Sequence, residues 1–212
     1  MKMTVPTMLT LLRIVLIPVL VVVFYLPYDW TNFAAAVVFA FASATDWLDG
    51  WIARRWNQYS AFGAFLDPVA DKLMVATALF LIVQSHPSKW MALWAAVIVG
   101  REIAVSALRE WMAEIGQRAK VAVATVGKIK TVVQMVALTM LLYQVPLLGL
   151  PVFTIGEWLL AGAALLTLWS GYEYLRAAWP SLREQAVAGA AVDGEGIDDA
   201  VAVGTTSPCR VA

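Results

Sequence analysis

The sequence predicts an all-α fold, a polytopic integral membrane bundle of six transmembrane helices with both termini in the cytoplasm. Three observations support this class. Of the 212 residues, 61% are hydrophobic and only 14% are charged, which is too apolar for a soluble domain. Apolar runs of roughly 20 residues, the length that crosses a bilayer of about 30 Å, recur along the chain. Lys and Arg gather on one set of predicted loops, as in polytopic membrane proteins.

The first three runs are predicted as helices from Met8 to Leu26, Thr31 to Trp51 and Phe62 to Gln84. The first resembles a signal peptide because it follows Lys2, but Arg13 interrupts it and no small-residue cleavage site follows. We therefore expect it to be retained as a span. The second and third runs are joined by a short polar loop, 56–60, so they are expected to be antiparallel neighbours.

The last three runs are predicted as helices from Trp90 to Trp111, Ile129 to Leu148 and Ile155 to Leu175. Pro87, Pro146 and Pro151 fall in predicted turns, where a missing amide hydrogen costs little. The ten tryptophans cluster near predicted helix ends, which is typical of interfacial aromatic belts. Together the six runs form a membrane domain over 1–180.

The distribution of Lys and Arg predicts the orientation, since positive residues stay preferentially in cytoplasmic loops. Nearly all of them lie toward one face, and the opposite loops contribute only Lys89. Residues 181–212 form an acidic tail rich in Ala and Gly, which we expect to be a disordered cytoplasmic extension. The chain carries 15 Lys and Arg and 15 Asp and Glu, so no overall basic field favours nucleic acid as a partner.

Four acids at the end of the second predicted helix and the start of the third give the strongest signal. Asp46 and Asp49 are three residues apart, and Asp67 and Asp71 are four apart, so each pair shares one face of its helix. We expect all four carboxylates to converge at one pocket on the cytoplasmic side. Small residues at the same place let the two backbones approach closely: Gly50, Ala53, Gly63 and Ala64.

Acids inside a membrane bundle need compensation, because each costs about 2.5–3.5 kcal/mol at the bilayer centre and four of them repel one another. Hard divalent cations bind oxygen ligands alone, and the lack of nearby His or Cys favours Mg²⁺ or Mn²⁺ over Zn²⁺. Two such ions, bridged by carboxylates, assist displacement at phosphorus. Alternatively, the acids only stabilise helix packing by pairing with basic residues: Arg54, Arg55, Lys72 and Arg101.

The pattern from Asp46 to Asp71, D-x2-D-G-x2-A-R-x8-G-x3-D-x3-D, matches at every fixed position the signature of the CDP-alcohol phosphatidyltransferases. The chain also resembles that family in its six helices, and its stretch from Pro6 to Arg13 is similar to a weaker family element. The resemblance implies that an alcohol displaces CMP from a CDP-linked lipid with the help of a divalent metal, bound as two ions in the site.

The resemblance also implies roles for individual residues. Asp46, Asp49, Asp67 and Asp71 would hold the metals, and Asp71 would in addition be the general base for the incoming hydroxyl. The CDP-lipid would be bound by these residues: Asp46, Asp49, Gly50, Ala53, Arg54, Gly63 and Thr10.

A second polar cluster runs from the fourth predicted helix to the fifth. Arg101 lies well inside the fourth helix, and Arg109 lies within about 80° of it around the helix axis, so both can face the acid pocket. With Lys128, they are candidate ligands for an acceptor that carries its own phosphate. The segments 99–103, 106–114 and 127–135 resemble bacterial family members whose acceptor is sn-glycerol 3-phosphate.

That closer resemblance implies CDP-diacylglycerol and sn-glycerol 3-phosphate as substrates in phospholipid biosynthesis. It implies a homodimer in the bacterial inner membrane, with the active site facing the cytoplasm. Alternatives with the same chemistry use serine, inositol phosphate or phosphatidylglycerol as acceptor. A divalent-cation carrier is an alternative of another class, but it needs acids throughout the membrane depth, and only Glu157 lies toward the opposite face. A non-enzymatic packing or assembly protein is the third alternative.

Overall fold

The computed structural model describes residues 5–56, 61–114, 125–147, 149–176 and 179, without the side chains of 6, 49–54, 56, 61, 64 and 125–129. The described chain forms six helices: α1 (Val5–Phe24), α2 (Thr31–Trp56), α3 (Ala61–Ser85), α4 (Lys89–Glu114), α5 (Thr125–Tyr143) and the C-terminal helix Val152–Arg176. The predicted all-helical class and the predicted number of helices are confirmed. The predicted tail, 181–212, lies outside the described residues.

Residues in the turns explain where two of the helices begin or end. Before α2, the hydroxyl of Thr31 donates to the carbonyl of Leu26 at 3.0 Å. The predicted end of the fifth helix at Leu148 is wrong, because α5 ends at Tyr143 and Gln144 has a left-handed φ of 59°. Pro146 explains the early end, since proline has no amide hydrogen to donate and disfavours helical geometry in the residue before it.

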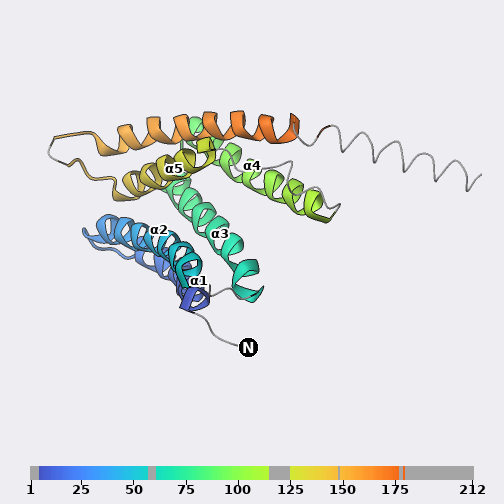
Figure 1. Cartoon of the computed structure of the whole chain (residues 1–212). Coiled ribbons are helices and arrows are strands. Elements are labelled where there is room, and N and C mark those ends of the chain that lie inside the picture. Colours follow the sequence, from blue (N-terminus) through green and yellow to red (C-terminus); the bar gives the residue numbers. More distant parts are fainter. Residues whose placement is uncertain (1–4, 57–60, 115–124, 148, 177–178, 180–212) are drawn as a thin grey trace, which may run out of the picture.

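The helices pack as two layers that share α3 (Figure 1). Helix α1 packs against α2 and α3, while α2 also packs against α5 and α3 against α4. The C-terminal helix lies on α5, where a Cβ added at Gly156 would come within 3.0 Å of the Leu141 side chain. Helices from different parts of the chain are thereby joined by one core, whose large buried members include Phe39, Leu79, Ile82, Ile98 and Leu138.

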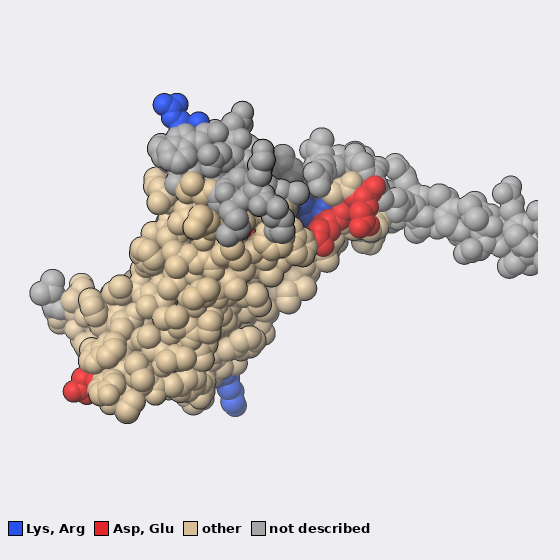
Figure 2. All heavy atoms as spheres, turned by 90° about the horizontal axis from the view of Figure 1, so that it is seen from below, with Lys and Arg blue, Asp and Glu red and all other residues tan. Residues whose placement is uncertain are grey.

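Three helical segments of the described chain are long and apolar enough to cross a membrane, namely Thr7–Phe24, Lys89–Glu114 and Val152–Arg176. Helices α2 and α3 have 26 and 25 residues and also exceed the roughly 20 residues that a span requires. In Figure 2, the described charged side chains in view gather at the ends of the bundle, and the surface between them is uncharged. These features are those of a membrane protein.

Candidate active site

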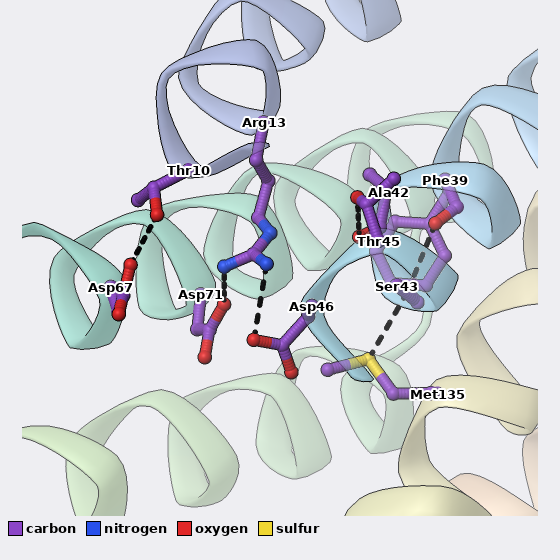
Figure 3. Close-up of polar contacts among 10 residues, drawn as sticks. All are labelled: Thr10, Arg13, Phe39, Ala42, Ser43, Thr45, Asp46, Asp67, Asp71 and Met135. Carbon is purple, nitrogen blue, oxygen red and sulfur yellow. Dashed lines mark hydrogen bonds and ion pairs between the residues drawn. The ribbon is translucent and has the colours of Figure 1, made fainter. Parts of the chain in front are cut away.

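Helix α1 links three carboxylates of the predicted motif that lie on two other helices. Asp46 comes from α2, and Asp67 and Asp71 lie one turn apart on α3. We call these three residues the acid cluster. Helix α1 contacts all of them, because the hydroxyl of Thr10 donates to Asp67 and the guanidinium of Arg13 bridges the other two (Figure 3). Thr10, which was expected to bind the CDP-lipid, therefore lies at the predicted metal site.

Arg13 is the cation at the centre of the acid cluster. Its Nη1 lies 2.5 Å from Asp71 Oδ1 and its Nη2 lies 3.1 Å from Asp46 Oδ1. The Arg13 side chain is only 1% exposed, whereas the side chains of Asp46 and Asp71 are 37% and 36% exposed. The buried guanidinium thus holds one oxygen of each carboxylate, and the rest of each carboxylate side chain is partly accessible to solvent.

The remaining motif residues are placed only in part. Asp49, Gly50, Ala53 and Arg54 lie on α2, but their side chains are outside the described residues. Gly63 is buried near the start of α3. Among the described side chains, no group of three or more Asp, Glu, His or Cys residues is close enough to hold a metal ion. The donors that do converge are carboxylate oxygens, which are the ligands that Mg²⁺ and Mn²⁺ prefer.

A pocket of about 240 Å³ adjoins the acid cluster, and we call it the central pocket. Asp46 and Asp71 form part of one wall, and helices α4 and α5 form the opposite side. Four basic residues line the pocket and constitute the basic cluster: Lys72, Arg101, Arg109 and Lys130. The predicted approach of Arg101 and Arg109 to the acids agrees with this lining. One small cavity is therefore lined by carboxylates and cations together, with Lys72 next to Asp71 on α3 and Glu102 next to Arg101 on α4.

Hydrogen bonds and ring contacts fix several of these cations. Lys72 donates to the hydroxyl of Ser106 on α4, and Arg101 donates through Nη2 to Ser170 Oγ at 2.7 Å. The guanidinium carbons of Arg101 and Arg109 lie 5.9 and 5.7 Å from the centre of the Tyr174 ring. The C-terminal helix, which carries Ser170 and Tyr174, thus orients two arginines of the basic cluster.

Lys130 is the most buried member of the basic cluster, at 4% exposed. No hydrogen bond or ion pair joins its ammonium group to another described residue, whereas Gln134, one turn on, donates to Glu102 at 3.4 Å. The side-chain amide oxygen of Gln134, Oε1, is buried without a partner among the described atoms. Lys128, the predicted phosphate ligand, lies on α5 with its side chain outside the described residues.

Sequence reasoning missed Arg13 and Lys130 as site residues, although the signal for Arg13 was present. It is the only charged residue of α1, and an ionisable residue within a membrane helix is a functional candidate by default. No comparable signal separates Lys130 from Lys128, because both stand in a run of basic residues at the predicted start of the fifth helix.

Glu157, the acid that a carrier would need, lies away from the central pocket. It lines two other pockets, one with Trp90, Trp94 and Trp158 and one with His86 and Phe153. Those residues lie in the turn just after α3, at the start of α4 and at the start of the C-terminal helix. No chain of acids connects Glu157 with the acid cluster in the described pocket linings.

Comparison with known proteins gives one consistent result. The family described as CDP-alcohol phosphatidyltransferase matches residues 3–169, which include all the helices that carry the central pocket. Proteins of Escherichia coli (strain K12) and Shigella flexneri, both named CDP-diacylglycerol–glycerol-3-phosphate 3-phosphatidyltransferase, are 52% identical to this chain over 189 residues. The matched region covers 87% of this chain and 100% of each relative.

Proposed function

The chain belongs to the CDP-alcohol phosphatidyltransferase family, and from this premise we propose that it transfers the phosphatidyl group of CDP-diacylglycerol to sn-glycerol 3-phosphate. The products are phosphatidylglycerophosphate and CMP. The observation that carries the proposal is the central pocket, where Asp46 and Asp71 line one small cavity together with the basic cluster. A phosphate-bearing acceptor on the cations then has its hydroxyl beside the carboxylates.

The donor side of the reaction is assigned to the motif on α2 and α3. Members of this family use divalent metal ions, and carboxylates such as those of the motif are the ligands that Mg²⁺ and Mn²⁺ prefer. Asp46, Asp49, Asp67 and Asp71 would hold such ions, which would neutralise the diphosphate and the leaving CMP. Along α2, Gly50, Ala53 and Arg54 would lie beside the cytidine diphosphate, with the small residues leaving space and the arginine supplying charge.

The acceptor side is assigned to the basic cluster. An acceptor phosphate needs charge-assisted donors, and Arg101, Arg109 and Lys130 line the same pocket. Because Ser170 and Tyr174 hold Arg101 in place, its remaining donors are oriented before substrate binds. Lys128 remains a candidate from the sequence alone. A basic pocket of this kind disfavours serine as the acceptor, since serine carries no phosphate.

In the proposed step, the primary hydroxyl of sn-glycerol 3-phosphate attacks the phosphorus that bears diacylglycerol. Asp71 accepts the hydroxyl proton while the new oxygen–phosphorus bond forms and the bond between that phosphorus and CMP breaks. Asp71 is suited to this role because it lines the central pocket between the metal-binding motif and the basic cluster. No covalent enzyme intermediate is needed.

We further propose the membrane arrangement that the charge distribution predicts. Six spans place both termini in the cytoplasm of a bacterial inner membrane, so that sn-glycerol 3-phosphate enters the central pocket from the cytosol. Residues 1–180 form the catalytic domain and 181–212 a cytoplasmic tail. The enzyme acts as a homodimer, which light scattering of the detergent-solubilised protein tests.

The test of function is CMP release by the purified protein in detergent with CDP-diacylglycerol and Mg²⁺. sn-Glycerol 3-phosphate is compared with serine, inositol phosphate and phosphatidylglycerol. We expect release that depends on sn-glycerol 3-phosphate. Release only with another acceptor would refute the assignment of the basic cluster, and no release from folded protein with any acceptor would refute the enzymatic proposal.

A further inference from the structure

Arg13 has no part in the reaction proposed above, yet it makes the two closest ion pairs of the acid cluster. It lies on α1, while its partners Asp46 and Asp71 lie on α2 and α3, so one guanidinium joins three helices. Figure 3 shows it placed between the two carboxylates, with a different nitrogen directed at each. A single planar group with two outward N–H donors suits this bridge better than an ammonium does.

The burial of Arg13 makes the guanidinium and the two carboxylates depend on each other for charge compensation. A guanidinium that is 1% exposed is costly unless it is paired, and Asp46 and Asp71 would repel each other without a cation between them. Arg13 is the only charged residue of α1, so that helix offers the acids no other charge. Without metal, the arginine and the carboxylates therefore stabilise one another.

We infer that Arg13 is an internal counter-cation that positions Asp46 and Asp71 in the metal-free enzyme and lowers the affinity of the same carboxylates for divalent cations. This inference rests on the metal site of the proposed function. A divalent ion on these carboxylates experiences the positive charge of Arg13 at close range, and the low dielectric of the interior strengthens that repulsion. Arg13 thus stabilises the metal-free fold at the expense of metal affinity, and it is a positioning residue.

The first experiment measures Mn²⁺ binding by electron paramagnetic resonance of the purified protein in detergent, with metal alone and no substrate. Arg13→Met should lower the Kd for Mn²⁺ by at least about tenfold, equivalent to about 1.4 kcal/mol. The matched control is Arg55→Met, which removes the same charge from an exposed position on α2 and should change the Kd by less than about twofold. An unchanged or raised Kd in Arg13→Met overturns the inference.

The second experiment measures thermal unfolding in EDTA, where metal cannot contribute. Arg13→Met should unfold at a lower temperature than wild type, and the double variant Arg13→Met, Asp71→Asn should recover part of the loss, because one of the two acids that lost the Arg13 charge is then neutral. A merely structural packing role predicts no recovery, so a double variant as unstable as Arg13→Met overturns the inference.

A second variant covers the case in which Arg13→Met does not fold, and the wild-type measurement separates a failure of the metal site from a failure of the inference. If Arg13→Met does not fold, Arg13→Lys keeps the charge and should leave the Kd for Mn²⁺ within about threefold of wild type, whereas tenfold tighter binding contradicts a charge effect. Wild-type protein that binds no Mn²⁺ refutes the proposed metal site. Wild-type protein that binds Mn²⁺ no more weakly than Arg13→Met refutes only the inference about Arg13.

Discussion

Replacing Lys130 by Met is expected to raise the KM for sn-glycerol 3-phosphate and to leave kcat nearly unchanged. The Lys130 side chain lines the central pocket and is 4% exposed, without a partner for its ammonium group among the described residues. The acceptor phosphate would supply that partner. A hydrogen bond to a charged group contributes about 1.5–3 kcal/mol, which corresponds to about a 10- to 150-fold change in KM.

The effect should fall on KM because the acceptor phosphate takes no part in bond making. A contact with it is equally strong in the ground state and in the transition state, so its loss weakens binding without slowing the bound complex. The stability of the folded protein should not fall together with the substrate affinity. The largely buried Lys130 side chain desolvates its ammonium group in part, and Met fills similar space without charge, so the melting temperature without substrate should stay equal or rise.

The assay is CMP release at varied sn-glycerol 3-phosphate with saturating CDP-diacylglycerol, beside thermal unfolding of the same preparations. Lys89→Met is the matched control, because it removes an exposed lysine at the start of α4 and should change neither quantity. Lys128→Met tests the candidate that rests on the sequence alone: residues two apart on a helix point about 160° apart, so we expect the two variants to differ in KM. A normal KM with a lowered melting temperature in Lys130→Met would refute the reasoning.

Three other outcomes are expected. Asp71→Asn should lower kcat by about 10²–10⁴-fold in protein that still folds, and retained turnover would exclude Asp71 as the base. Treatment with EDTA should abolish CMP release, and added Mg²⁺ or Mn²⁺ should restore it; activity that survives chelation contradicts the assigned metal site. A chain truncated after Glu184 should keep its kcat and KM, as measured by the same assay, and a large loss in a folded truncate would show that the tail contributes to catalysis.

The sequence by itself predicted the helices and the order of the acid motif. Apolar runs separated by prolines and polar loops specify helix number, because a span needs a minimum length and proline disfavours continuation. The ends were less accurate. Helix α2 runs to Trp56, past the predicted Trp51, and α5 ends at Tyr143, where apolar residues continue into the turn and hydropathy alone cannot locate the boundary. Asp46, Asp67 and Asp71 could be expected near one another because they lie on consecutive helices joined by a short loop, and Thr10 and Arg13 of α1 contact them.

Only the tertiary structure decided which other side chains join that group. Arg13 and Asp71 are 58 residues apart in sequence, and Arg101 and Ser170 are 69 apart, so their pairing depends on how non-consecutive helices pack. Periodicity gives the face of each helix but not the partner that this face meets. The choice of Lys130 within a run of basic residues, and the use of Arg13 as the cation between two acids, follow from the rotation and contact of helices that no local pattern encodes.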